Sequence, residues 1–192
     1  MKSPEFKSDE EYWMYYWLLS LQHHGFVREI CYEPEPIELF DGAYSVGVLT
    51  GSRKPKTVRK VIFNPTEYTM DFSIVIDERL LGHLFMTPET FWKNNKVPFI
   101  SVDENSGIVF LEVKPEYDFK NMNRMVKNTL KWVYDKYKIY INMVHPTELF
   151  EKTFAPYEYY FSRKTGKPRK SAKQCKTIEQ WLKDVSEKQI QS

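Results

Sequence analysis

Two short apolar runs constrain the fold of this chain more than any other feature of the sequence. FSIVI (72–76) and GIVFL (107–111) are rich in β-branched and aromatic residues, which is typical of strands buried in a sheet. The second run continues directly into EVKP. Successive side chains of a strand point to opposite faces, so Glu112 and Lys114 are predicted to share one face while Val113 stays with the core. A carboxylate and an ammonium would then lie side by side at a strand end.

The other patterned segments alternate between helix and strand. The first helix is predicted to begin at the N-cap Ser8, with Glu11 at the capping-box position, and to end at Gly25. Further strands are predicted at 26–34, 37–40, 60–77 (interrupted at Pro65) and 138–144, and further helices at 118–136 and 177–189. This order predicts an α/β fold with a mixed central sheet flanked by helices, in one domain spanning 1–192.

The predicted first helix is apolar on nearly all of its faces. A helix of this kind is either buried or part of an interface. Its aromatic residues are therefore expected in the core or in a contact with a partner protein or the second subunit of a homodimer, rather than as a platform for stacked bases: Tyr12, Trp13, Tyr15, Tyr16 and Trp17.

Positive charge is unevenly distributed along the chain. The net charge is +2, yet the interval between Glu158 and Glu179 contains seven basic residues and no acidic one, which leaves the rest at about −5. The extension 157–192 is interpreted either as a flexible solvated tail or as a track for backbone phosphates, and the second interpretation is favoured. The cations predicted to contact DNA are Arg163, Lys164, Lys167, Arg169, Lys170 and Lys173.

Nothing in the sequence predicts a membrane or a secreted protein. There is no apolar run of about 18 residues and no basic-then-apolar leader. Cys31 and Cys175 have neither metal-ligand nor redox spacing. A cytoplasmic protein is therefore expected, and zinc chemistry is not.

Asp71 lies immediately before the FSIVI run, in a strand expected to belong to the same sheet as the one that ends at Glu112. Two acids and a lysine on neighbouring strands form a site suited to a hard divalent cation such as Mg²⁺, which takes oxygen ligands. A lysine beside such a cation can hold an attacking water or neutralise charge during phosphodiester cleavage. The residues therefore favour a nuclease.

The spacing Asp71…Glu112-Val113-Lys114, with a glutamate on the leading helix, resembles the PD-(D/E)xK (restriction-endonuclease-like) nuclease superfamily. Over roughly residues 8–144 the chain is also similar to small phage endodeoxyribonucleases and to the catalytic domain of the endonuclease subunit of certain cut-and-paste transposons. The features that carry this likeness are Ser8, Glu11, Tyr15 and Gly25, and the phrases EPEP, YTMDF and LEVKP. Met70 stands where such proteins often have proline.

The resemblance implies a Mg²⁺-dependent endonuclease acting on DNA, with Mn²⁺ able to substitute, encoded by a phage or mobile element and active in the host cytoplasm. It implies metal binding by Asp71, Glu112 and the carbonyl of Val113, assistance to the water by Lys114, and a further catalytic carboxylate from Glu11. From the residues alone, Glu11 could equally serve only as a helix cap, with Glu10 as the alternative carboxylate.

Other interpretations stay open at this point. Residues 78–104 lack any clear period and lengthen the interval between Asp71 and Glu112, so they are interpreted as an insertion that either contacts a substrate or partner or is a surface elaboration. The function alternatives are a non-catalytic module that binds nucleic acid or protein on the same fold, and a nuclease for RNA or branched DNA.

Overall fold

The computed structural model describes residues 5–50, 54–91, 97–102, 107–115 and 122–190. Its centre is a four-stranded sheet in the order β1 (Val27–Tyr32), β6 (Phe72–Ile76), β9 (Ile108–Val113) and β10 (Ile141–Val144). The pairs β1/β6 and β6/β9 are antiparallel, and β9/β10 is parallel. The α/β class and the mixed sheet predicted from the sequence are therefore confirmed.

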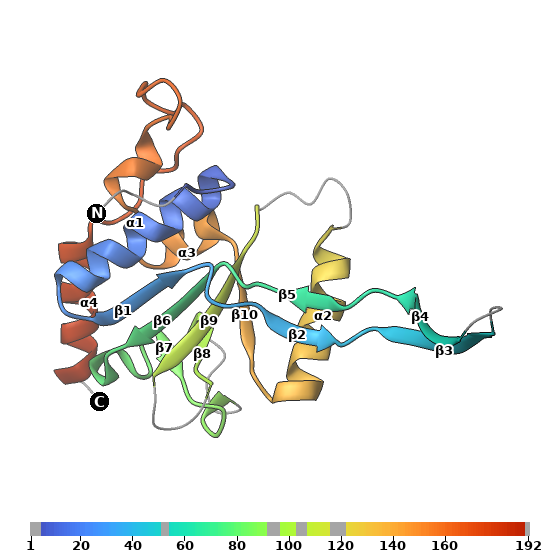
Figure 1. Cartoon of the computed structure of the whole chain (residues 1–192). Helices are drawn as coiled ribbons and strands as arrows, with labels where there is room; N and C mark the ends of the chain where they lie inside the picture. Colours follow the sequence, from blue (N-terminus) through green and yellow to red (C-terminus); the bar gives the residue numbers. More distant parts are fainter. Residues whose placement is uncertain (1–4, 51–53, 92–96, 103–106, 116–121, 191–192) are drawn as a thin grey trace.

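Helices cover both faces of this sheet (Figure 1). One face packs against α1 (Asp9–His23), α3 (Pro146–Lys152), the 3-10 helix η3 (Tyr157–Tyr160) and α4 (Ile178–Ile190), whose apolar residues share a single core cluster with the strands. The other face packs against α2 (Met122–Tyr137) in a smaller cluster. Within the described ranges, no helix has the length and apolarity needed to cross a membrane.

The alternation expected of a half-buried strand is visible along β9. Val109, Leu111 and Val113 point into the cluster formed with α1, while Phe110 packs on the α2 side. Since side chains alternate between faces, Glu112 lies on the Phe110 side.

Helix α1, whose sequence is apolar on nearly all faces, is largely buried in the body of the protein. The Ser8 side chain caps the helix by accepting from the Glu11 amide, as predicted. Gly25 follows the helix at φ 74°, a conformation that favours glycine. The fully buried residues of the helix include Met14, Trp17, Leu18 and Leu21, and Trp13 is 5% exposed. Its large side chains are therefore mainly core.

The described part of segment 78–104 belongs to the main core. It forms the 3-10 helix η1 (Glu78–Leu80) and two short parallel strands, β7 (Phe85–Met86) and β8 (Phe99–Ile100). Its LLGHLF piece buries Leu84 and Phe85, and Leu80 and Phe99 are fully buried as well. This piece is not a surface elaboration. Most of the FWKNN piece lies outside the described residues.

The prediction of a single interrupted strand over 60–77 is wrong, because the chain makes three strands there. Between β1 and β6 it leaves the sheet as a long antiparallel arm, clearly seen at the right of Figure 1. The base of this arm pairs β2 (Ile37–Phe40) with β5 (Thr66–Tyr68), and its outer ribbon pairs β3 (Ala43–Thr50) with β4 (Pro55–Phe63). Strand β3 and helix α3 were not predicted.

Gly107, just before β9, is expected to tolerate no side chain. Its φ is +60°, and a Cβ at this position would lie 2.4 Å from the Ile76 carbonyl oxygen. Gly107→Ala should therefore lower the free energy of unfolding by roughly 2–4 kcal/mol, measured by urea denaturation. Gly47→Ala is the control, since an added Cβ there meets nothing within 4 Å. Equal stability of the two variants would contradict this assignment of strain.

Candidate active site

Asp71 and Glu112 come together at one end of the sheet. Phe72 pairs with Leu111 in the β6/β9 register, so the next step along each strand sets Asp71 opposite Glu112 on the same face. The Asp71 amide donates to the Leu111 carbonyl at 3.1 Å. The Val113 amide donates to Asp71 Oδ2 at 2.6 Å. The juxtaposition expected from the strand pattern is therefore present.

The surroundings of Asp71 disfavour its charge. Burial raises the pKa of this carboxyl from its ordinary 3.8 to about 7, and the neighbouring negative charge of Glu112 raises it further in the same direction. The Val113 amide and the Lys114 ammonium act in the opposite direction and do not offset these effects. Two carboxylates thus share one site with less positive charge than they need.

Glu112 is held by two partners. Glu112 is buried, with 5% of the residue exposed. Its Oε1 lies 2.5 Å from Lys114 Nζ, and its Oε2 accepts a hydrogen bond from the Tyr68 hydroxyl at 2.5 Å. Burial, followed by the charge of Glu112, raises the pKa of Tyr68 well above its usual range. Tyr68 therefore remains a donor and fixes the orientation of Glu112. Lys114 lies on the same face as Glu112, as predicted.

Glu11 is the buried carboxylate at the start of α1, with 7% of its surface exposed. Its Oε2 accepts from the Tyr32 hydroxyl at 2.6 Å and from the Lys7 amide at 3.0 Å, and its Oε1 accepts from the Ser8 hydroxyl at 3.1 Å. Its negative charge contributes to the raised pKa of Asp71. The Glu11 side chain therefore holds the N-cap Ser8 and the residue before it, and it also lies within electrostatic reach of the acidic pair.

Lys7 and Glu33 complete the surroundings of the site and were missed at the sequence level. They form an ion pair, and the hydrogen bond to Glu33 raises the pKa of Lys7, with Glu11 and Asp71 adding to the effect. The Glu33 amide donates to the Asp71 carbonyl at 2.9 Å. No motif signals either residue, or the hydroxyls of Tyr32 and Tyr68, because their closeness to the acids depends on how the chain enters and leaves the arm.

The donor atoms at this site fit a hard divalent cation. Among the described residues, no three His, Cys, Asp or Glu side chains form a metal-ligand set. Asp71 and Glu112 supply two carboxylates. The N–H and C=O of one strand residue point toward the same edge, so the Val113 carbonyl faces the side on which its amide contacts Asp71. Two carboxylates and one carbonyl are oxygen donors of the kind that Mg²⁺ or Mn²⁺ accepts, with water and phosphate completing the shell.

Residues 161–177, which carry most of the basic residues of the extension, form a loop that is held against the body. Arg163 donates to the Phe6 carbonyl at 3.0 Å. Arg169 donates to the Tyr159 carbonyl at 2.7 Å, and its guanidinium lies 3.8 Å from the centre of the Trp13 ring. Two of the cations predicted to contact DNA therefore anchor the loop to the N-terminal part of the body.

The remaining cations of the loop differ in their surroundings. Lys173 forms an ion pair with Glu151. Lys164, Lys167 and Lys170 are exposed. A role in DNA binding stays a prediction for all of them, and these last three are the best placed for it.

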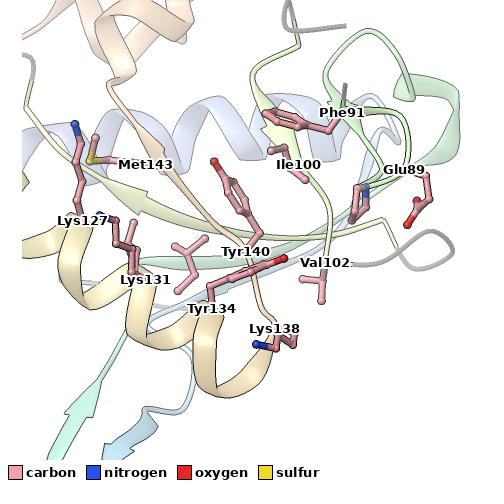
Figure 2. Close-up of a pocket in the computed structure, with 13 residues that line it drawn as sticks. Glu89, Phe91, Ile100, Val102, Lys127, Lys131, Tyr134, Lys138, Tyr140 and Met143 are labelled. Carbon is pink, nitrogen blue, oxygen red and sulfur yellow. The ribbon is translucent and has the colours of Figure 1, made fainter. Parts of the chain in front are cut away.

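A separate hollow of about 920 Å³ lies between α2, β10 and the segment that contains β8 (Figure 2). Apolar side chains such as Ile100, Val102 and Met143 line it, and Lys127 and Lys131 lie along its α2 side. Neither carboxylate of the acidic pair borders this hollow. The candidate chemistry thus resides at the strand ends and not in this cavity.

Comparison of the chain with protein-family models, with curated proteins and with solved structures finds no match.

Proposed function

We propose that this chain is a metal-dependent endonuclease of the restriction-endonuclease-like fold that hydrolyses phosphodiester bonds of DNA. The order α1, β1, β6, β9, α2, β10, with two antiparallel pairs followed by a parallel one, supports that fold. The observation that carries the proposal is the meeting of Asp71, Glu112 and Lys114 at adjacent strand ends, with the pKa of Asp71 raised to about 7. Such a site needs a positive ligand to hold both acids ionised.

Each residue has a defined task in this proposal. Asp71, Glu112 and the Val113 carbonyl would hold a Mg²⁺ ion, which would supply positive charge to the phosphoryl group. Lys114 holds the attacking water in line with the leaving 3′ oxygen and offsets the charge that develops on phosphorus. Tyr68 keeps Glu112 in place through the hydrogen bond at 2.5 Å. Glu11 adds a third carboxylate at the edge of the site.

Nicking of supercoiled plasmid tests the function directly. The purified protein should convert the plasmid to the relaxed form in Mg²⁺ or Mn²⁺ and should leave it intact in EDTA. Parallel reactions with single-stranded DNA, RNA and a four-way junction identify the preferred nucleic acid. Metal-stimulated cleavage of RNA or of the junction alone would redirect the proposal to those substrates. Tight DNA binding without metal-stimulated cleavage would instead support a non-catalytic module.

A further inference from the structure

The base of the arm is fixed to the body. Lys136, near the end of α2, donates from Nζ to the Glu38 carbonyl at 2.9 Å. Ile37 and Leu39 of β2 pack against the cluster that contains Val133 of α2. The arm therefore leaves the body in a defined direction.

The outer ribbon, β3 and β4, is exposed over most of its length. Neither strand has a buried residue. Large apolar side chains face solvent, with Val46 67% exposed, Leu49 63% and Phe63 65%. A two-stranded ribbon is marginally stable alone in water, so its exposed surface indicates that a ligand covers it.

The charge of the ribbon indicates which ligand that is. Five basic residues and no acidic residue lie between Asp41 and Glu67. Lys56 and Lys60 share one face, because they are four residues apart on β4, and Arg59 is on the other. The Arg59 guanidinium lies 3.3 Å from the centre of the Tyr44 ring. Charges on an open ribbon also prevent edge-to-edge pairing, but either sign would serve that purpose.

We propose that the outer ribbon is a DNA-binding arm that lies along the duplex and contacts its phosphates away from the acidic site, on the same duplex. This inference rests on the proposed function, since DNA is the ligand in both. The major groove admits a two-stranded β-ribbon. At about 3.3 Å per residue, β3 spans roughly 26 Å, or about three quarters of one turn of duplex.

The root of the arm connects it to the acidic site. The hydrogen bond from the Glu33 amide to the Asp71 carbonyl closes the root, and β5 ends at Tyr68, the residue that holds Glu112. Strands β2 and β5 separate the outer ribbon from the strand ends that carry the carboxylates, so a duplex that lies along the whole arm would reach both.

A second copy of the chain is the weaker candidate for the occupant. Pairing two outer ribbons would bring the three cations of one β4 strand against the three of the other without compensating acids, which is unfavourable. DNA neutralises the same cations and releases counterions, and its thymine methyl groups and sugars can cover the aliphatic residues.

Salt-dependent binding tests this inference. The Asp71→Asn protein is titrated without divalent metal onto a fluorescent duplex of about 30 base pairs, roughly three turns, between about 50 and 200 mM salt. Adding Lys56→Ala and Lys60→Ala should reduce the slope of log affinity against log salt by about 2 and weaken binding at least tenfold at the lower salt. The control adds Lys152→Ala and Lys183→Ala, which remove the same charge from exposed positions on α3 and α4. It should retain most of the affinity.

The outcomes separate the arm from the catalytic proposal. Equal DNA affinities and equal salt slopes for the arm and control variants would overturn the DNA-binding role of the arm, even if the wild type nicks plasmid. If the arm variant binds DNA more weakly but the wild type never cleaves DNA, the DNA-binding role of the arm would stand and the proposed nuclease activity would be rejected. If light scattering showed that the arm variants change only the oligomeric state, with DNA binding intact, the ribbon would be assigned to self-association and the inference would fail.

Discussion

Asp71→Ala and Lys114→Ala are each expected to lower the rate of metal-dependent DNA cleavage by roughly 10²–10³-fold or more, with DNA binding largely retained. Asp71→Ala removes one of the two carboxylates opposite each other across β6 and β9. Lys114→Ala removes the cation 2.5 Å from Glu112. Single-turnover cleavage of a labelled duplex measures the rate, and anisotropy measures binding. Full cleavage activity of either variant would contradict the assignment of Asp71 and Lys114 to the catalytic site.

A matched control comes from another acid and lysine pair. Lys176 and Asp184 form an ion pair around α4, with both side chains 41% or more exposed. Lys176→Ala and Asp184→Ala make the same changes of charge and should leave cleavage within about twofold, because exposed pairs contribute little. Loss of activity in these controls would point to a general effect of charge rather than to the site.

The parts of this structure that were predictable from sequence are those in which burial imposes a pattern. FSIVI and GIVFL are strands because both runs fill one core between helices, and alternation then places Glu112 and Lys114 together. The cap formed by Ser8 and Glu11 was also predictable, since it depends on residues three positions apart. Pairing of Asp71 with the end of β9 required only that the two strands be neighbours.

The arm gave no such pattern because neither face of β3 or β4 is covered. Apolar and polar residues are mixed on both faces of the outer ribbon, and alternation carries information only where one face is buried. The secondary structure of segment 78–104 could not be predicted for another reason. Its strands β7 and β8 have two residues each, too few to show a period.

The partners of the acids were also beyond reach of sequence reasoning. Tyr68 contacts Glu112 across 44 positions, and Tyr32 contacts Glu11 across 21. Both tyrosines lie where the chain enters or leaves the sheet toward the arm. Their role depends on the path of the arm, which the sequence alone did not reveal.

Asp71→Asn is expected to stabilise the metal-free protein above neutral pH by about 4 kcal/mol. The pKa of Asp71 is 3.8 in its ordinary state and about 7 in the fold, and each unit of difference is worth about 1.36 kcal/mol. The folded state holds the proton more tightly, so wild-type stability falls as pH rises from about 4 to 7, and the asparagine variant lacks this loss. Its amide oxygen can still accept from Val113. Urea denaturation at pH 4, 6 and 8 measures the difference, which should be small at the lowest pH.

Asp77 provides a control of opposite sign. Hydrogen bonds from Arg79 lower the pKa of this carboxyl to about 2, so its contribution to stability is present above the ordinary pKa and is lost as pH falls toward 2. Asp77→Asn should therefore destabilise the protein at pH 7, where Asp71→Asn stabilises it.

Mg²⁺ or Mn²⁺ should raise the melting temperature of the wild type and of Asp77→Asn, with a smaller rise for Asp71→Asn, because a cation bound at the acids stabilises the fold by mass action. A wild-type stability that does not fall relative to Asp71→Asn between pH 4 and 8 would show that burial and the charge of Glu112 do not disfavour the ionised Asp71 carboxyl. The proposal of a cation between the two acids would then lose its basis.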